Sequence, residues 1–239
     1  MKIKLLFIPF ISILFYATGF AQMETNKKKH SLEFSTGYNS GSLKNLEFAP
    51  IARYDYNGLV SKLKYERHSS RGNLFTIQLA YLNSELQTDL IPVLNLGYTK
   101  IGMRISYLKQ VYSKNNLSIH LGLQSHSNVS IYAKENENRS IVDQSFGLGS
   151  RFSYQINDKH SLFSELAIPM VLFRVTDANA NIFSLNRYQG VLWNIGYNHS
   201  LSKEIDLKFS YDFNYDRLQI PNAFREVQYQ FNLGINFKF

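Results

Sequence analysis

The amino-acid sequence predicts an all-β chain that folds as an antiparallel, up-and-down barrel. Two observations predict this fold. Apolar and polar residues alternate with period two through most of residues 30–239, which is the pattern of strands with one apolar face. Short polar turns also alternate with longer polar connections along the chain, as they do in successive β-hairpins. Helical spacing fits none of the alternating segments.

The composition excludes several other classes of protein. Aromatic residues make up 15% of the 239 residues and charged residues only 18%, whereas an ordinary soluble domain has about 25% charged residues. No long apolar run occurs after the first 21 residues, which argues against a helical membrane protein. The lack of cysteine excludes disulfide scaffolds, thiolate metal sites and a lipid-anchored lipoprotein. The net charge of +8 is spread along the chain, so we expect no nucleic-acid partner.

Residues 1–21 have the features of a secretory signal peptide. Two lysines precede an apolar stretch from Leu5 to Phe20, and small residues stand at the expected cleavage site after Ala21. The stretch is shorter than the roughly 20 residues that a spanning helix needs. We therefore expect an exported chain with a disordered N-terminus at residues 22–29 and a barrel over residues 30–239.

The strands are assigned from the alternation, which is clearest in the last one. From Val227 to Phe239 every second residue is aliphatic or aromatic, and the residues between them are Gln, Asn, Gly or Lys. The same reasoning predicts ten strands, at residues 30–38, 50–68, 74–84, 93–112, 117–133, 145–156, 162–176, 188–200, 205–216 and 226–239. Between them we expect four short turns and five longer loops, the loops near residues 39–49, 85–92, 134–144, 177–187 and 217–225.

Two of these strands change the parity of their apolar residues midway. Tyr54 and Tyr56 give way to Leu59 and Leu63, and a similar change follows Tyr98 in the fourth strand. We interpret both changes as β-bulges. An extra hairpin at each point is the alternative, and it would raise the number of strands to twelve.

Periodicity alone does not decide which face of the barrel is inside. Export, the regular alternation of turns and loops, and an aromatic last residue favour a transmembrane barrel, in which the apolar face contacts lipid. The residues expected to face lipid are Phe75, Ile77, Leu79, Leu121, Trp193, Ile195, Phe209 and Leu233. The polar network expected in the lumen comprises Glu33, Lys62, Lys64, Glu66, Arg104, His120, Arg151, Glu165, Lys208 and Asp212.

On these strands the sequence resembles small bacterial outer-membrane β-barrel proteins. The resemblance covers residues 30–239 and includes the final Gln228–Phe239 strand, which ends in Phe-Lys-Phe. It implies a location in the cell outer membrane among outer-membrane lipids, with short turns in the periplasm and longer loops outside. It also implies that Phe237 and Phe239 form the signal recognised by the barrel-assembly machinery. Fold resemblance implies little about activity.

The predicted lumen favours a non-enzymatic function. A ten-stranded barrel is narrow, and mixed acidic and basic side chains would fill it as paired charges. We therefore expect a structural role, or passage of small solutes through a narrow polar lumen, without a cofactor. The histidines beside termini and turns, His30, His68, His160 and His199, suggest no metal cluster.

The alternative is an outer-membrane lipid hydrolase centred on His126, similar to lipid A deacylases or phospholipases. Those enzymes have a serine and a histidine two positions apart on one strand. Here Ser127 is adjacent to His126 and is expected on the opposite face, whereas Ser130 shares its face at a distance of about 13 Å. Asp212 and Asp216 are also four residues apart, too far to share a catalytic water as a protease pair.

Overall fold

A computed structural model of the chain describes residues 29–45, 53–89, 95–134, 137–176, 179–219 and 223–239. The expected signal peptide and all but the last residue of the expected disordered N-terminus lie outside the described residues. The strands are β1 (His30–Asn45), β2 (Tyr54–His68), β3 (Leu74–Leu86), β4 (Leu96–Lys114), β5 (Leu117–Lys134), β6 (Glu137–Asn157), β7 (His160–Val175), β8 (Ala180–Ser184), β9 (Tyr188–Ser200), β10 (Ile205–Leu218) and β11 (Phe224–Lys238). Within the described part of the chain, no helix is long and apolar enough to cross a membrane.

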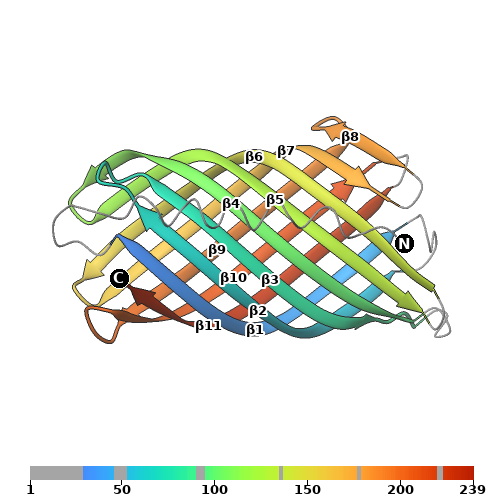
Figure 1. The fold of residues 1–239 in the computed structure, drawn as a ribbon, viewed down its shortest axis with the longest axis horizontal. Helices are drawn as coiled ribbons and strands as arrows, with labels where there is room; N and C mark the ends of the chain where they lie inside the picture. Colours follow the sequence, from blue (N-terminus) through green and yellow to red (C-terminus); the bar gives the residue numbers. More distant parts are fainter. Residues whose placement is uncertain (1–28, 46–52, 90–94, 135–136, 177–178, 220–222) are drawn as a thin grey trace.

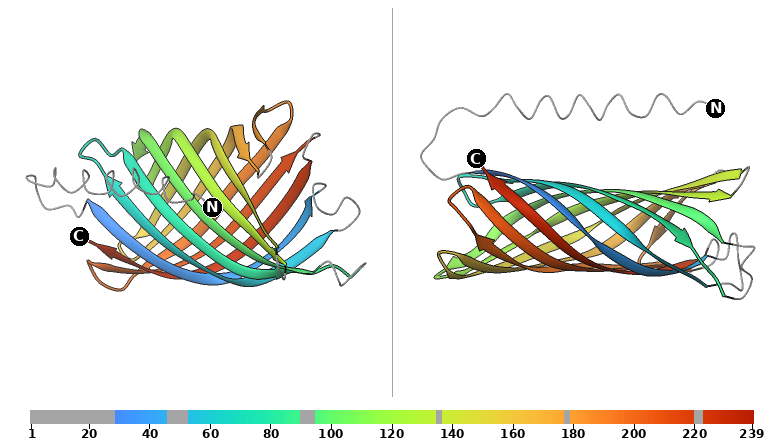
Figure 2. Two further views of the ribbon diagram at one scale, coloured as in Figure 1. Left: turned by 45° about the vertical axis from the view of Figure 1, so that its right-hand side comes forward. Right: turned by 90° about the horizontal axis from the view of Figure 1, so that it is seen from below.

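The strands form one closed antiparallel barrel (Figures 1 and 2). Each strand pairs with its neighbour in sequence, and β1 pairs with β11 along its whole length. The short strand β8 is the exception: it pairs with the last five residues of β7, while β9 pairs with the first part of β7. The barrel wall therefore has ten strands, with β8 as an addition. This confirms the predicted fold class and the strand number of ten rather than twelve.

The two ends of the barrel differ. Four tight turns lie at one end, and the backbone of His30 there bonds to that of Phe239. We call this the turn end; in Figure 1 it is the side that carries the C-terminus. The opposite, loop end carries the longer connections. Gly72 and Asn115 adopt positive φ angles of 78° and 53° in two of the turns, a conformation that glycine and asparagine tolerate best.

The strands reach further toward the loop end than the sequence indicated. Residues 39–45 and 137–144, which were expected in loops, continue β1 and β6. Their Asn, Ser and Glu residues suggested loops by composition, but the hydrogen-bond ladder with β11 and β5 continues through them. Backbone pairing with a neighbouring strand outweighs the weak local preference of such residues.

Neither predicted bulge exists. The β1–β2 and β3–β4 ladders run without a register shift past the expected positions, and the only irregularity of the β4–β5 ladder lies between Gln110 and Tyr112. Tyr54, Tyr56 and Tyr98 keep the inward parity of their strands and are at most 3% exposed. What changes along these strands is the polarity of the lumen, which becomes apolar toward the loop end.

The outer face is apolar and the inner face is polar over the rest of the barrel. The residues expected to face lipid all lie on the outer face, where Leu79, Leu121 and Phe209 are nearly half exposed. Their strand neighbours on the inner face, such as Thr76, His120 and Lys208, are buried. A soluble barrel would have the reverse arrangement, so the barrel is built to lie in a membrane.

Candidate functional site

The interior of the barrel is the candidate site, and it has three layers. Charged side chains fill the part next to the turn end, a small polar cavity lies in the middle, and an apolar core fills the loop end. The inward residues of β2 pass through the three layers in order, from Tyr54 in the apolar core at the loop end to Glu66 among the charged side chains near the turn end.

In the charged layer, ion pairs cross the lumen. Lys64 lies 2.9 Å from Glu165 and 3.2 Å from Glu66, and Arg151 lies 2.5 Å from Glu66 and 3.1 Å from Glu165. Lys64 is on β2 and Glu165 on β7, which are five strands apart in the ring of ten. Their contact therefore spans the lumen from one wall to the opposite one. Such a layer leaves each of these buried charges paired, as a low-dielectric interior requires.

A second set of ion pairs lies around Asp212. Its carboxylate accepts hydrogen bonds from Lys62 at 2.6 Å, from Asn194 at 2.8 Å and from Asn232 at 2.7 Å. Lys208 and Glu33 form a further pair at 2.7 Å. Lys62 is on β2 and Glu33 on β1, whereas Asp212 and Lys208 are both on β10. These ion pairs therefore link strands on the two sides of the seam at which β1 pairs with β11.

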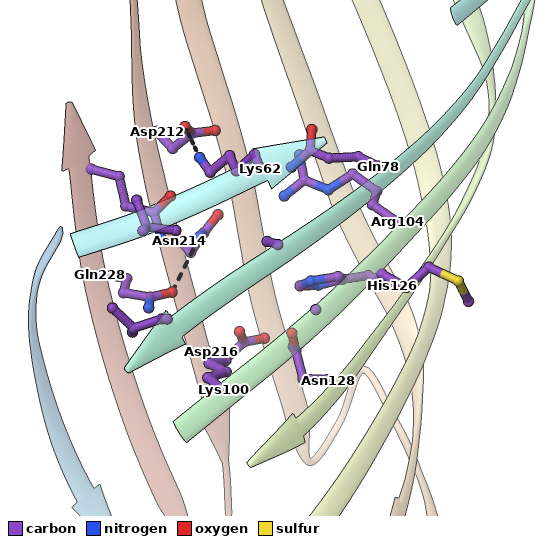
Figure 3. Close-up of a pocket in the computed structure, with 16 residues that line it drawn as sticks. Lys62, Gln78, Lys100, Arg104, His126, Asn128, Asp212, Asn214, Asp216 and Gln228 are labelled. Carbon is purple, nitrogen blue, oxygen red and sulfur yellow. Dashed lines mark hydrogen bonds and ion pairs between the residues drawn. The ribbon is translucent and has the colours of Figure 1, made fainter. Parts of the chain in front are cut away.

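The cavity lies between this polar set and the loop end (Figure 3). It has a volume of about 50 Å³ and is lined by residues of β2, β3, β4, β5, β10 and β11. Arg104 reaches into it from between Gln78 and His126, which flank it on the neighbouring strands. The Arg104 Nε is buried without a hydrogen-bond partner, and in the described part of the chain the guanidinium has no ion pair.

A second, smaller cavity adjoins the first on the loop side. Its volume is about 20 Å³, and His126, Ser130, Ser145 and Asp216 are among the residues that line it. One water needs roughly 10–15 Å³ measured in this way, so the two cavities have room for a few waters. Neither is large enough for an organic substrate.

Glu226 joins the cavity to the apolar core. Its carboxylate accepts hydrogen bonds from the hydroxyls of Tyr56 and Tyr98, at 2.5 and 3.1 Å, and from Lys100 Nζ at 2.7 Å. Asp216 makes a similar contact, accepting a bond of 2.5 Å from the hydroxyl of Tyr188. The tyrosines thus have their rings in the core and their hydroxyls on the carboxylates, which suits an amphipathic side chain at a boundary.

The loop end of the lumen is filled by two apolar clusters, which we call the cap. They consist of Leu43, Tyr54, Tyr56, Val60, Leu82, Leu86, Tyr98, Tyr132 and Ile141, and of Leu172, Phe183, Tyr188, Leu218 and Phe224. Tyr98 packs edge-on against Tyr56 and stacks on Tyr132. On the other side of the lumen the Arg174 guanidinium lies 4.3 Å from the ring centre of Phe224. All side chains of the cap are at most 8% exposed.

The structure brings most of the expected lumen residues into buried ion pairs. All ten lie on the inner face, and eight of them are ion-paired: Glu33, Lys62, Lys64, Glu66, Arg151, Glu165, Lys208 and Asp212. His120 instead contacts the carbonyl oxygen of Gly72 at 3.0 Å, and Arg104 faces the cavity. Lys100 and Glu226 were not among the residues expected from the sequence, and Asp216 was considered only as a partner of Asp212. Glu226 could have been found from the alternation, because it shares a strand face with Gln228 and Gln230, which point inward.

The residues of the expected hydrolase alternative are placed on both faces of the wall. His126 faces the lumen, whereas Ser127 is on the outer face, where its hydroxyl bonds to Gln144. Ser130 is buried on the inner face beside the smaller cavity. A serine that the sequence did not indicate, Ser145, lies directly opposite His126 on β6, and its hydroxyl donates to the His126 carbonyl oxygen at 3.4 Å.

A closed barrel of ten antiparallel strands, with aliphatic and aromatic residues outside and paired charges inside, defines an outer-membrane β-barrel protein. The outer-membrane protease OmpT from Escherichia coli has a similar fold: the TM-score is 0.59 at 10% sequence identity, over 92% of this chain and 99% of that one. Neisserial surface protein A is more distantly similar, with a TM-score of 0.44 at 10% sequence identity, over 87% of this chain and 97% of that one. The transport unit of the autotransporter AIDA-I from Escherichia coli has a TM-score of 0.46 at 12% sequence identity, over 96% of this chain and 97% of that one. Identities this low show the fold and not the activity.

No protein-family model and no curated protein matches the sequence.

Proposed function

We propose that this protein is a closed, non-enzymatic barrel with a structural role in the outer membrane. The observation that carries the proposal is the contact of Lys64 with Glu165 across the full width of the lumen, within a layer of paired charges. A wide channel needs a lumen free of such crossings, and the described lumen is crossed next to the turn end and packed with apolar side chains at the loop end.

The packing favours the structural role over passage of small solutes. A solute that entered from the loop end would have to displace the cap, in which Tyr54, Leu86 and Tyr98 are at most 1% exposed. It would then have to separate buried ion pairs, and removing a partner from such a pair typically costs about 3–5 kcal/mol. Both barriers oppose the rapid passage expected of a channel.

Planar-bilayer recording tests this proposal. The protein is refolded, its barrel is verified by heat-modifiable gel mobility, and it is inserted beside a sixteen-stranded porin measured in the same bilayers. We expect the porin to give discrete conductance steps and this protein to give none. The control is a variant in which Arg53 and Asp55, an exposed ion pair, are both changed to alanine, and it should also give no conductance steps. Reproducible unit steps from the unmodified protein would contradict the proposal.

A lipid hydrolase is the second candidate, and one observation favours it: Ser145 lies directly opposite His126. Against it stands the small cavity on which both residues border. Fatty-acid release from vesicles of phospholipid or lipid A separates the two candidates. We expect no release by the refolded protein. Release that disappears in His126→Ala and Ser145→Ala, but persists in Ser127→Ala on the outer face, would establish the hydrolase instead.

A further inference from the structure

Two histidines from neighbouring strands meet on the outer face at the turn end. His160 is the first residue of β7, and His199 is the last but one of β9. The two residues are paired in register, with their Nδ1 atoms 3.4 Å apart and their ring centres 4.8 Å apart. Both side chains are half-buried, and both residues stand beside turns at the end of the barrel.

A third polar atom converges on the same point. Tyr197 lies two residues before His199 on the same face of β9, and its hydroxyl contacts the Nδ1 of His160. The two rings stack with their centres 5.8 Å apart. An imidazole nitrogen carries either one proton or one lone pair. The His160 Nδ1 therefore has two partners for the single hydrogen bond that it can make well.

The backbone at this end holds the two histidines in place. The Asn157 side chain accepts hydrogen bonds from the backbone N–H groups of Lys159 and His160, at 2.9 and 3.0 Å. The Ser200 N–H donates to the Lys159 carbonyl oxygen at 2.8 Å, which joins the end of β9 to the β6–β7 turn. The backbone positions of the two histidines are thus fixed by hydrogen bonds of the wall and the turn, a preorganisation that favours ligand binding.

From this convergence we propose that His160 and His199 bind a divalent transition-metal ion, with zinc as the best match. Zinc lies about 2.0–2.1 Å from an imidazole nitrogen in tetrahedral geometry, which puts two ligand nitrogens about 3.3 Å apart. The observed 3.4 Å matches that separation without movement of either strand. Water completes the coordination of the ion. The Tyr197 hydroxyl, which contacts the His160 Nδ1, turns away from that nitrogen when the ion binds. The proposal is independent of whether the lumen is closed.

Zinc titration of the refolded protein in detergent, followed by calorimetry, tests the site. We expect one zinc ion bound per chain, with an affinity that falls at least roughly tenfold in each of His160→Gln and His199→Gln because a ligand is lost. The variants His30→Gln and His68→Gln alter histidines at the same end of the barrel and should bind zinc as the unmodified protein does. Heat-modifiable mobility of every variant shows that its barrel is intact.

Three results would overturn the proposal. They are the absence of zinc binding by the unmodified protein, unchanged binding in both ligand variants, and an equal loss of binding in His30→Gln or His68→Gln, which would indicate unspecific attachment to histidines. Copper(II) provides a second readout, because its electron paramagnetic resonance spectrum reports nitrogen ligands. We expect nitrogen couplings in the unmodified protein that weaken in either ligand variant.

Discussion

Removal of the Asp212 carboxylate should strongly destabilise the barrel. In Asp212→Ala the Lys62 ammonium loses its 2.6 Å ion pair, and Asn194 and Asn232 lose their acceptor. The side chains of Lys62 and Asp212 are only 9% and 7% exposed, so bulk solvent compensates little for the lost contacts. Breaking a buried pair of this kind costs about 3–5 kcal/mol. The expected value lies toward the upper end, because Arg104 on the same cavity then adds an uncompensated like charge.

The measurement is equilibrium unfolding by guanidinium in lipid vesicles, followed by the fluorescence of the single tryptophan, Trp193. The matched control replaces both partners, as Lys62→Leu with Asp212→Leu. We expect this double variant to lose less free energy of unfolding than Asp212→Ala alone, since exchanging a buried pair for apolar residues is often neutral. The reasoning would be refuted if Asp212→Ala lowered the free energy of unfolding by less than about 1 kcal/mol. It would also be refuted if the losses in Lys62→Leu and Asp212→Leu simply added up in the double variant.

Three further predictions concern the wall of the barrel. In Gly37→Ala the new methyl group would lie 2.1 Å from a backbone oxygen of β11, so we expect the free energy of unfolding in vesicles to fall by about 1–3 kcal/mol. Gly97→Ala is the control and should leave it nearly unchanged, because the nearest atom to its new methyl group is 3.5 Å away. Ile195→Arg, midway along β9, should lower the free energy of unfolding by about 2–4 kcal/mol, because it puts a charge in the middle of the lipid face. Ile156→Arg, beside a turn, should lower it by only about 0–1 kcal/mol. Equal losses in the two variants would contradict a membrane-embedded outer face. Deletion of Phe239 should lower the amount of assembled barrel in cells while leaving refolding into vesicles unchanged, if the assembly machinery reads this residue; a matching defect in both assays would point to a purely structural role.

The fold was predictable because one signal runs through the whole chain. The period-two pattern of residues such as Phe231, Leu233 and Ile235 determines which side of each strand is apolar, and the turn residues between strands separate the hairpins. The polar residues of the inner face followed from the same phase. These inferences need only local sequence, and they correctly predict a ten-stranded barrel with its polar lumen.

The cap was not predictable in the same way. If apolar residues faced outward along the whole of each strand, Tyr54, Tyr56 and Tyr98 would require bulges, and this prediction was wrong. In the structure the lumen changes from charged to apolar along its length, and local sequence does not distinguish a change of register from a change of environment. Contacts across the lumen, such as that of Glu226 with Lys100 at 2.7 Å, join residues 126 positions apart and depend on closure of the barrel.

The histidine pair was missed for a related reason. His160 and His199 each stand beside a different turn, and only the pairing of β7 with β9 puts them opposite one another. A cross-strand comparison of the first and last residues of successive hairpins would have shown it, because the turn lengths determine the register.

The central claim is that the aromatic and aliphatic face of the barrel lies in lipid while the charged face is enclosed. Trp193 tests it without any substitution, because it is the single tryptophan, lies midway along β9 on the outer face, and donates its indole N–H to Ser164 on the same face at 3.0 Å. The refolded protein is placed in vesicles whose acyl chains carry bromine near the bilayer centre. We predict strong quenching of Trp193 fluorescence by the brominated lipid and little quenching by aqueous iodide. Strong quenching by iodide, with none by the brominated lipid, would contradict the account.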